Sequence, residues 1–197
     1  MDKHPPAGWR VLESEYLSRR PWLTVRRERL QMPNGRVIPE FYVLEYPDWV
    51  NTIAVTTSGM FVFVRQYRHG IGEMSLELCA GVRDPADASP LEAARRELLE
   101  ETGYGNGAWQ EYMILSPNPG SQTNLVHTFL ATGVEKIDNQ HLEESEDISV
   151  HLLSLDEVRA LLDSGQLKQA THLAPLWKYM AAYRQEEKYS SPPAKYS

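Results

Sequence analysis

Three glutamates near the middle of the chain, Glu97, Glu100 and Glu101, constrain most strongly what this sequence can fold into. On a helix, spacings of three and four residues place their carboxylates on one face, where each like-charge pair costs about 0.2–0.5 kcal/mol. A divalent cation, which prefers oxygen ligands, would offset this repulsion. The alternative is an acidic helix face that contacts only solvent.

The residues around the three glutamates delimit a short helix. Ser89 and Glu92 have the spacing of a capping box, with proline at the first helical position between them, and Gly103 stands where the helix should end. Leu91 and Leu98 belong to an apolar stripe at helical spacing. This framing favours a metal site over a solvated face.

The segment 81–104 resembles the Nudix box, in which Gly, five residues, Glu and seven residues precede Arg-Glu-apolar-x-Glu-Glu-x-Gly-apolar. Residues 96–104 match the second half at every defined position. The first half departs from the pattern, because Gly81 lies one residue too far from Arg96, and Asp87 or Ala88 stands where Glu is expected. The resemblance implies that this acidic residue supports the loop and Arg96, a role open to Asp87 if its shorter side chain reaches the guanidinium.

Charge and cysteine content restrict the partners. The 197 residues carry a formal net charge of −7, so we expect no nucleic-acid partner and no anionic membrane partner. A small phosphorylated substrate stays compatible, since metal ions supply positive charge locally. No stretch is long and apolar enough to span a membrane, and the first ten residues lack the apolar segment of a signal peptide. The single Cys79 fits a reducing cytosol, so we expect a cytoplasmic protein.

Residue patterns predict an α+β fold, an α/β/α sandwich around a mixed β-sheet. The predicted strands are residues 9–17, 22–30, 37–46, 50–56, 60–66, 74–80, 109–115, 125–131 and 148–153. Beside the central helix, a capping box at Ser154 and Glu157 opens a helix to Asp163, and residues 169–187 form the last helix.

The hairpin around Asn34-Gly35 has little core of its own. Residues 1–46 are therefore predicted to be an N-terminal β element that packs on the main domain or on a second subunit. Residues 47–187 are predicted to form the main domain, and residues 188–197 a mobile tail.

Within the Nudix family, the resemblance is closest to the ADP-ribose and nucleoside diphosphate sugar pyrophosphatases, and it covers nearly the whole chain. The segments that carry it outside the box are residues 65–68, 76–81, 119–120 and 144–148. Cys79 stands where such relatives often have proline, which indicates a packing variation rather than a nucleophile.

The resemblance implies a metal site that binds more than one Mg²⁺ or Mn²⁺ ion. The implied ligands are Glu97, Glu100, Glu101, Glu146 and the backbone carbonyl of Ala80. The implied general base is Glu144, with Glu143 as its competitor because a shift of one position exchanges them. Arg96 and Glu100 complete the implied catalytic set, and the alternative for the acidic loop is ordinary solvation.

Three further residues are implied to bind substrate. Arg68 either grips a phosphate or pairs with Glu77. Trp22 is either a core residue or an aromatic that stacks on the nucleobase. In the resembling subfamily this stacking often crosses a dimer interface, so the resemblance also implies a homodimer with exchanged N-terminal strands.

The predicted function is hydrolysis of a nucleoside diphosphate linked to a sugar, which gives a nucleoside monophosphate and a sugar phosphate. ADP-ribose is the first substrate considered, although the loop at residues 121–123 lacks the Glu of many ADP-ribose enzymes. The alternatives are other nucleotide sugars, such as GDP-mannose or UDP-glucose, and a non-catalytic Nudix-fold module that senses a nucleotide. Such modules commonly have an eroded box, whereas all three box glutamates are present here.

Overall fold

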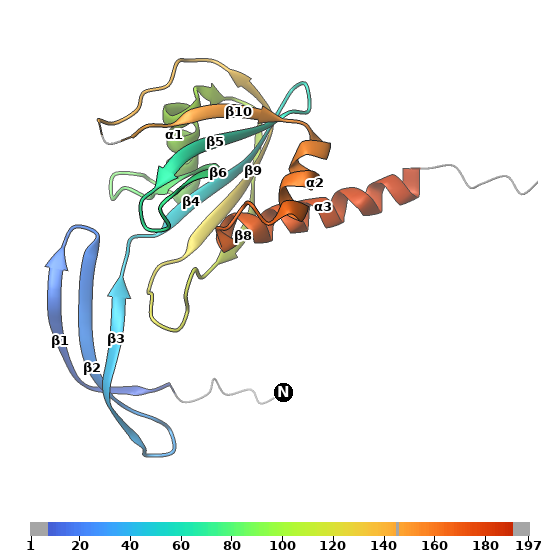
Figure 1. Cartoon of the computed structure of the whole chain (residues 1–197). Helices are drawn as coiled ribbons and strands as arrows, with labels where there is room; N and C mark the ends of the chain where they lie inside the picture. Colours follow the sequence, from blue (N-terminus) through green and yellow to red (C-terminus); the bar gives the residue numbers. More distant parts are fainter. Residues whose placement is uncertain (1–7, 145, 191–197) are drawn as a thin grey trace, which may run out of the picture. The chain divides into compact units, whose positions relative to one another are not determined.

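The computed structural model describes residues 8–144 and 146–190 (Figure 1). Its contacts divide the chain into two compact units. The N-terminal unit comprises the chain up to Pro47 together with Ser116–Leu125, and the main unit comprises Asp48–Leu115 with the chain from Val126 onward. A long loop of the second half of the sequence therefore belongs to the unit formed by the first residues.

The N-terminal unit is an antiparallel sheet in the order β1 (Arg10–Arg20), β2 (Leu23–Gln31), β3 (Val37–Glu45). The predicted hairpin turn at Asn34-Gly35 is confirmed, with Gly35 at a φ of 83°. Strand β3 also holds the loop of its own unit, because the Leu44 N–H donates to the Ser121 carbonyl at 2.8 Å. The strand predicted at residues 9–17 is confirmed as β1, which lies at an edge of this sheet.

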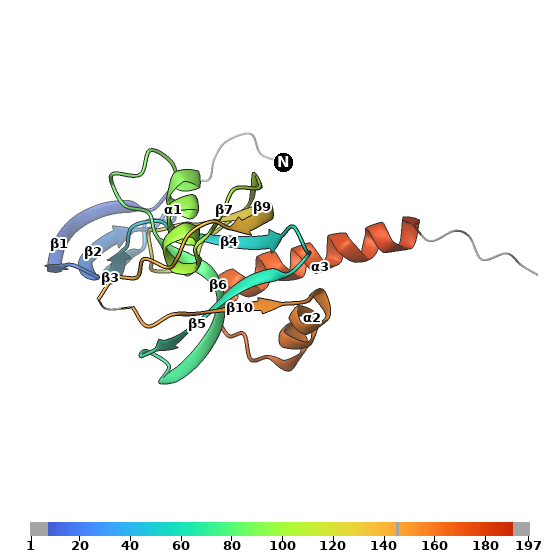
Figure 2. The same ribbon diagram turned by 90° about the horizontal axis from the view of Figure 1, so that it is seen from above.

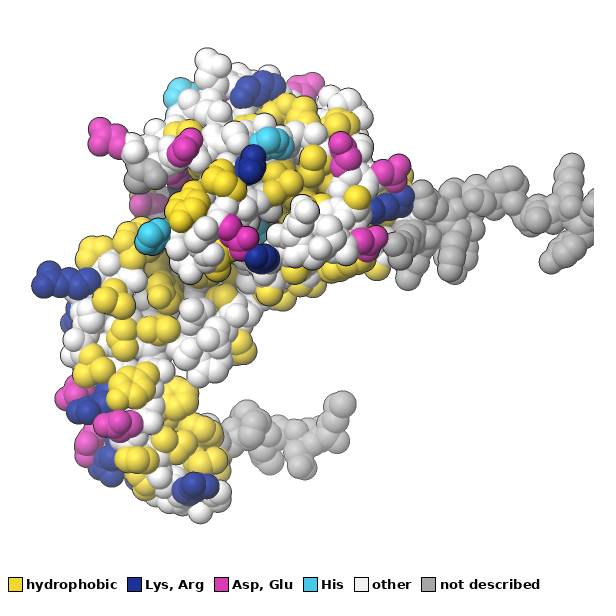
Figure 3. Space-filling model, viewed as in Figure 1, with side chains coloured by type: hydrophobic (Ala, Val, Ile, Leu, Met, Phe, Trp, Pro, Cys, Tyr) yellow, Lys and Arg dark blue, Asp and Glu magenta, His cyan; other side chains and the backbone are white. Residues whose placement is uncertain are grey.

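Ion pairs link the three strands of this unit. Arg27 pairs with Glu15 on β1 at 2.6 Å and with Glu40 on β3 at 3.1 Å, and Arg29 pairs with Glu13 at 2.5 Å. Among the described residues of the unit, the buried apolar side chains are Leu30 and Val43. Yellow apolar side chains lie on its surface in Figure 3, in keeping with the exposure of Trp9, Val11, Tyr16, Leu17, Trp22, Leu23, Val37 and Tyr42.

The main unit is built on a mixed sheet. Its described strands are β4 (Trp49–Thr56), β5 (Phe61–Arg68), β6 (Glu73–Val82), β7 (Tyr104–Gly105), β8 (Ala108–Leu115), β9 (Val126–Lys136) and β10 (Ser149–Leu153). They are arranged as β10-β5-β6-β4-β9-β7, with β8 on β9. Strand β4 pairs parallel to β9 and antiparallel to β5 and β6, so the prediction of a mixed sheet is confirmed.

Alternate residues of the strands face two helical layers. Helix α1 (Pro90–Thr102) packs on the face that carries Ala54, Val62 and Cys79. Helices α2 (Leu155–Ser164) and α3 (Ala170–Ser190) pack on the other face, which carries Ile53, Phe61, Phe63 and Leu78. Figure 2 shows α1 on one side of the sheet and α2 and α3 on the other. The predicted α/β/α arrangement is therefore confirmed.

Several predicted boundaries change in the structure. Strand β9 continues to Lys136, beyond the predicted end at Ala131, and β7 was not predicted. Helix α3 reaches Ser190, so the first three residues of the predicted tail are helical, and residues 191–197 lie outside the described part of the chain. No helix within the described residues is long and apolar enough to cross a membrane.

Pro175 lies inside α3, where it cannot donate to the carbonyl of Thr171. The side-chain Nδ2 of Asn51, on β4, donates to that carbonyl at 3.0 Å. Asn51 is buried, so this bond ties the start of α3 to the centre of the sheet.

Candidate metal and substrate site

Local sequence fixes both ends of the helix that carries the glutamates. Ser89 has extended backbone, and its Oγ accepts from the Glu92 N–H at 3.2 Å. Glu92 pairs with Arg95 at 3.2 Å, so only the serine half of the predicted capping box is formed; the box at Ser154 and Glu157 is complete. Gly103 ends the helix at a φ of 69°.

The side chains of Glu97 and Glu101 point toward β6, whereas the side chain of Glu100 is partly exposed to solvent. The Glu97 side chain is 13% exposed and the Glu100 side chain 43%, and the Glu101 residue is 3% exposed. Glu101 accepts a hydrogen bond from the Ala80 N–H at 3.2 Å, which fixes it at the end of β6. Two of the three predicted carboxylates therefore lie in the interior beside the predicted carbonyl ligand, and the third lies at the rim.

Burial raises the pKa of the Glu101 carboxyl to about 7, and the charges of Glu97 and Glu146 add to this effect. Burial also raises the pKa of Glu97, against the lowering effect of Arg96. The thiol of Cys79 is buried and interacts with Glu101, and its own pKa is raised by burial. A deprotonated Cys79 is therefore disfavoured, in keeping with a packing role.

These carboxylates fit a divalent cation chemically, because buried like charges with oxygen donors are stabilised by a bound cation. In the described residues they are not gathered into a group of three or more that could hold a metal ion as they stand. Arg96 occupies part of the space, since its Nη1 donates to Glu97 at 2.9 Å and to Glu100 at 3.0 Å.

Gly81 makes room for the buried carboxylate. A Cβ built on Gly81 would overlap the carboxylate carbon and both oxygens of Glu97. Only glycine allows this side chain to approach the backbone at the end of β6 so closely. The glycine of the box is therefore required by the position of Glu97, whatever the length of the loop that follows.

Asp87 reaches Arg96. The guanidinium donates from Nε to Asp87 Oδ1 at 3.1 Å, from Nη2 to Asp87 Oδ2 at 2.9 Å, and from Nη2 to the Val82 carbonyl at 3.1 Å. The pKa of Asp87 is lowered, chiefly by the hydrogen bond from Arg96. The extra loop residue is accommodated by a tight turn, in which the Asp87 N–H donates to the Asp84 carbonyl at 3.0 Å. A shorter acid in a longer loop thus makes the contact that the resemblance implies.

The acidic loop before β10 brings one carboxylate toward the helix. Glu146 raises the pKa of both Glu97 and Glu101 through its charge. Its Oε2 accepts from the Glu143 N–H at 2.9 Å. Glu143 and Glu144 are both exposed, so burial does not distinguish them, and the choice of Glu144 as the base stays a prediction.

Arg68 and Glu77 form a two-point ion pair, with 2.6 Å between Nη2 and Oε2 and 3.0 Å between Nε and Oε1. Glu77 is 2% exposed at its side chain and Arg68 40%. Of the two alternatives for Arg68, pairing with Glu77 is therefore present, and the exposed part of the guanidinium is free to contact a ligand as well.

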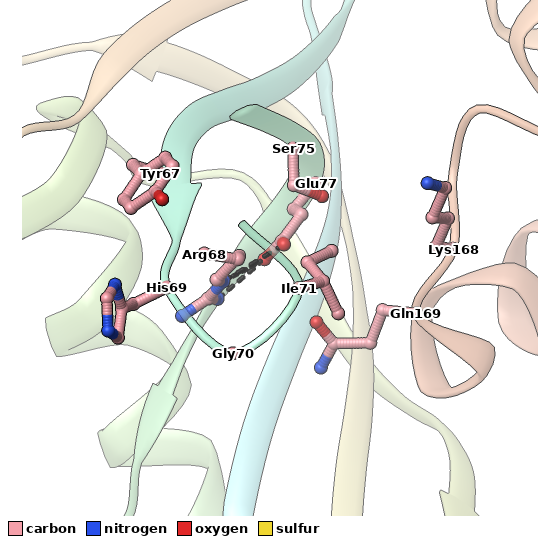
Figure 4. Close-up of a pocket in the computed structure, with 9 residues that line it drawn as sticks. All are labelled: Tyr67, Arg68, His69, Gly70, Ile71, Ser75, Glu77, Lys168 and Gln169. Carbon is pink, nitrogen blue, oxygen red and sulfur yellow. Dashed lines mark hydrogen bonds and ion pairs between the residues drawn. The ribbon is translucent and has the colours of Figure 1, made fainter. Parts of the chain in front are cut away.

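This ion pair lies in a cavity of ≈ 520 Å³. Figure 4 shows the pair in the middle, Tyr67 and His69 to one side, and Lys168 and Gln169 across the cavity. His172 is buried and interacts electrostatically with this ion pair; burial lowers its pKa to about 4, against the effect of Glu77. Lys168, Gln169 and His172 were not singled out from the sequence, since they lie in and after a short connection without a motif.

Trp22 is 67% exposed and occupies the turn between β1 and β2 with a φ of 63°. The core alternative for Trp22 is therefore wrong. A left-handed conformation is unusual for a bulky residue and costs free energy. The stacking role remains a prediction, since Trp22 belongs to the N-terminal unit and the glutamates to the main unit.

Two family profiles match the chain. A profile described as the nucleoside diphosphate sugar hydrolase N-terminal domain matches residues 9–44, and the NUDIX domain matches residues 47–174. Because the NUDIX match covers more than half of the chain, the chain belongs to the Nudix family. Hydrolases of this family generally use divalent metal ions.

Individual relatives are similar over between 56% and 73% of this chain. An ADP-ribose pyrophosphatase of Mycobacterium tuberculosis is 33% identical over 138 residues, which are 69% of this chain and 66% of that protein. An ADP-ribose pyrophosphatase of Bacillus subtilis is 28% identical over 144 residues, 73% of this chain and 77% of that protein. A GDP-mannose pyrophosphatase of Pectobacterium atrosepticum is 36% identical over 118 residues, 56% of this chain and 60% of that protein.

Among solved structures, the crystal structure of an ADP compounds hydrolase has a TM-score of 0.80 to this chain at 21% identity. The match covers 93% of this chain and 98% of that one, and it shows the fold. The two family profiles and the sequence relatives confirm the predicted family, its nucleotide-sugar branch and the predicted enzyme class, a Nudix pyrophosphatase.

Proposed function

We propose that this chain hydrolyses the pyrophosphate bond of a nucleoside diphosphate linked to a sugar, with ADP-ribose as the first substrate. The observation that carries the proposal is the buried pair Glu97 and Glu101 beside Ala80, with the charge of Glu146 acting on both. The relatives named ADP-ribose pyrophosphatase support the choice of sugar nucleotide. The relative named GDP-mannose pyrophosphatase supports GDP-mannose as the second candidate.

The proposed metal ligands are Glu97, Glu101, Glu146 and the Ala80 carbonyl, with Glu100 at the rim. Mg²⁺ or Mn²⁺, more than one ion per site, would neutralise charge on the pyrophosphate and favour deprotonation of the attacking water. The pKa of Glu101 is raised to about 7 in this chain, and a bound cation would lower it by favouring the ionised carboxylate. Arg96, held by Asp87, orients the carboxylates of Glu97 and Glu100.

We assign proton removal from the attacking water to the carboxylate of Glu144. Its exposed position lets it meet a substrate that enters from solvent, and a positioned base contributes roughly 10²–10⁴ in rate. Arg68 would contact a substrate phosphate through the part of its guanidinium that faces the cavity, while Glu77 holds the other side.

The deciding experiment is a panel of ADP-ribose, GDP-mannose, UDP-glucose and related dinucleotides with Mg²⁺ or Mn²⁺. Cleavage is followed as the release of phosphatase-sensitive products. We expect ADP-ribose to be cleaved fastest, and Glu101→Gln to lower turnover by orders of magnitude while circular dichroism stays unchanged. Tight nucleotide binding without turnover by the unchanged chain would favour the sensing module instead, and near-normal turnover by the variant would exclude Glu101 as a ligand.

A homodimer with exchanged N-terminal strands forms part of the proposal, as does a cytoplasmic location, which rests on the single reduced Cys79. In the N-terminal unit Leu30 and Val43 are buried, whereas Trp9, Val11 and Trp22 are exposed. Contact with a second copy of the chain would bury these exposed apolar side chains. Light scattering should give twice the chain mass, and a monomer would contradict the dimer.

A further inference from the structure

The C-terminal turn of α1 ends in carbonyl groups that the helix cannot satisfy itself. Three of them accept hydrogen bonds from the last residue of β9 and from the segment that follows it. The bonds run from His141 N–H to the Glu100 carbonyl (2.8 Å), from Gln140 Nε2 to the Glu101 carbonyl (2.6 Å) and from Lys136 Nζ to the Thr102 carbonyl (2.6 Å). The turn that carries two of the box glutamates is thus held by residues about forty positions further along the chain.

Gln140 does more than cap the helix. The same Nε2 donates to the Ile148 carbonyl at 3.2 Å, so one amide group joins two separate backbone segments. Ile148 is 6% exposed and packs in the cluster that contains Leu98 and Cys79. Glu146 stands two residues before Ile148. The backbone of Glu101 and the backbone that follows Glu146 are therefore tied through a single side chain.

We propose that Gln140 is a positioning residue of the metal site, which sets the spacing between the carboxylates of Glu101 and Glu146. The proposal rests on the function proposed above, in which both carboxylates bind metal. The hydrogen bonds of Glu146 with Glu143 are local to the acidic loop and hold only its internal shape. The bonds of Gln140 fix where the end of that loop lies relative to α1.

The two N–H groups of one planar amide explain why glutamine suits this position. Methionine has nearly the same length and shape but no donor, so Gln140→Met removes both bonds and leaves two partly buried carbonyls without this partner. Lysine is long enough and carries three donors, and its charge suits a helix C-terminus. Gln140→Lys therefore restores the tie with different chemistry.

The test measures Mn²⁺ affinity of the full chain without substrate, by the paramagnetic resonance signal of free Mn²⁺. Loss of a residue that orients metal ligands typically costs 10–100-fold in affinity or activity. We expect Gln140→Met to bind Mn²⁺ about 10–100-fold more weakly and Gln140→Lys to bind within a few-fold of the unchanged chain. The matched control is Gln110→Met on β8, an exposed position where we expect no change.

Hydrogen exchange and kinetics separate positioning from general stability. In Gln140→Met the amides of residues 146–148 should exchange faster, and the metal concentration for half-maximal activity should rise with little change in substrate KM at saturating metal. If Gln140→Met does not fold, Gln140→Asn, which keeps the amide on a shorter arm, should show the same defects to a smaller degree.

Three results would overturn the proposal: unchanged Mn²⁺ affinity in Gln140→Met, an equal loss in Gln110→Met, or failure of lysine to restore affinity. Absence of Mn²⁺ binding in the unchanged chain would overturn it as well. If the unchanged chain binds Mn²⁺ but cleaves no sugar nucleotide, the proposed function fails, while the affinity comparison still decides the role of Gln140.

Discussion

The N-terminal unit and the main unit obtain their stability from different sources. In the main unit, three buried apolar clusters cover both faces of the sheet. In the described N-terminal unit the buried apolar side chains are Leu30 and Val43, and cross-strand pairs such as Arg27 with Glu15 and Glu40 supplement them. Exposed ion pairs contribute little, whereas a large apolar side chain contributes about 1.5–3 kcal/mol when it is fully buried. Among the described residues, burial raises the pKa of a carboxyl in the main unit, at Glu97 and Glu101, because only that unit has a large apolar interior.

That difference explains where the candidate chemistry lies. The pKa of Glu101 is raised to about 7 because its carboxyl is buried away from solvent, and the apolar cluster with Leu98 and Cys79 excludes that solvent. In the described N-terminal sheet the buried carboxylate is Glu28, which pairs with Arg26 at 2.7 Å. The pKa of the exposed Glu13 is lowered by the hydrogen bond from Arg29, in the opposite direction to Glu101. The sheet also contributes exposed apolar surface, including Trp22.

The largest expected effect concerns the acidic loop of the main unit. Glu144→Gln should lower kcat by roughly 10²–10⁴, the contribution of a positioned general base, with little change in metal affinity. Glu146→Gln should instead weaken the metal dependence, and Glu143→Gln should do little. Steady-state kinetics at several Mg²⁺ concentrations separate these effects. If kcat fell strongly in Glu143→Gln and only slightly in Glu144→Gln, Glu143 would be assigned as the base instead.

A core substitution should break the main unit. Leu176 on α3 is fully buried in the cluster with Ile53 and Phe63. Leu176→Ala should lower the free energy of unfolding by about 2–5 kcal/mol, since it removes buried methyl groups and leaves a cavity. Urea denaturation followed by tryptophan fluorescence measures it. A cost below 1 kcal/mol would show that this side of the sheet contributes less than its burial indicates.

Acid should weaken the main unit through His172. Its pKa in the folded state is lowered to about 4 by burial, from an ordinary 6.5, so below pH 6.5 the unfolded chain binds a proton that the folded chain does not. The contribution of His172 is therefore full above pH 6.5 and falls as the pH drops toward 4, by roughly 2 kcal/mol at pH 5. The raised pKa of Glu101 acts in the opposite direction, since the folded chain binds that proton below pH 7. Lowering the pH from 7.5 to 5 should therefore shift the urea midpoint to a higher value in His172→Leu than in the unchanged chain, after each is referred to its own midpoint at pH 7.5. Equal differences would exclude His172 as the cause.

The smallest effect is expected in the N-terminal unit. Arg27→Met removes the exposed pairs with Glu15 and Glu40. We expect a slight loss of stability that shrinks further as salt is raised, because salt screens exposed charges. Thermal unfolding at 0.05 and 0.5 M salt, referred to the unchanged chain, provides the measurement. A loss as large as that of Leu176→Ala would contradict the contrast between the two units.

Local sequence determined the ends of the helices and the turns. Ser89, Gly103 and the complete box of Ser154 and Glu157 act within three or four residues, so their effect is readable without the fold. The same holds for the turn at Asn34-Gly35 and for the alternation that marks the strands. The spacing of the three glutamates and the residues after Arg96 fixed the family by the same local pattern.

Only the tertiary structure decided which distant groups meet. The contact of Arg96 with Asp87 depends on the path of the loop that joins them. The close approach of Glu97 to Gly81 depends on how α1 packs on β6. The exposure of Trp22 likewise depends on how the N-terminal sheet folds. The assignment of Ser116–Leu125 to the N-terminal unit, and the bond of Gln140 to Glu101, join segments that are far apart in sequence. Such contacts leave no periodic signal, because their geometry is set by how the strands and helices pack together and not by residue spacing.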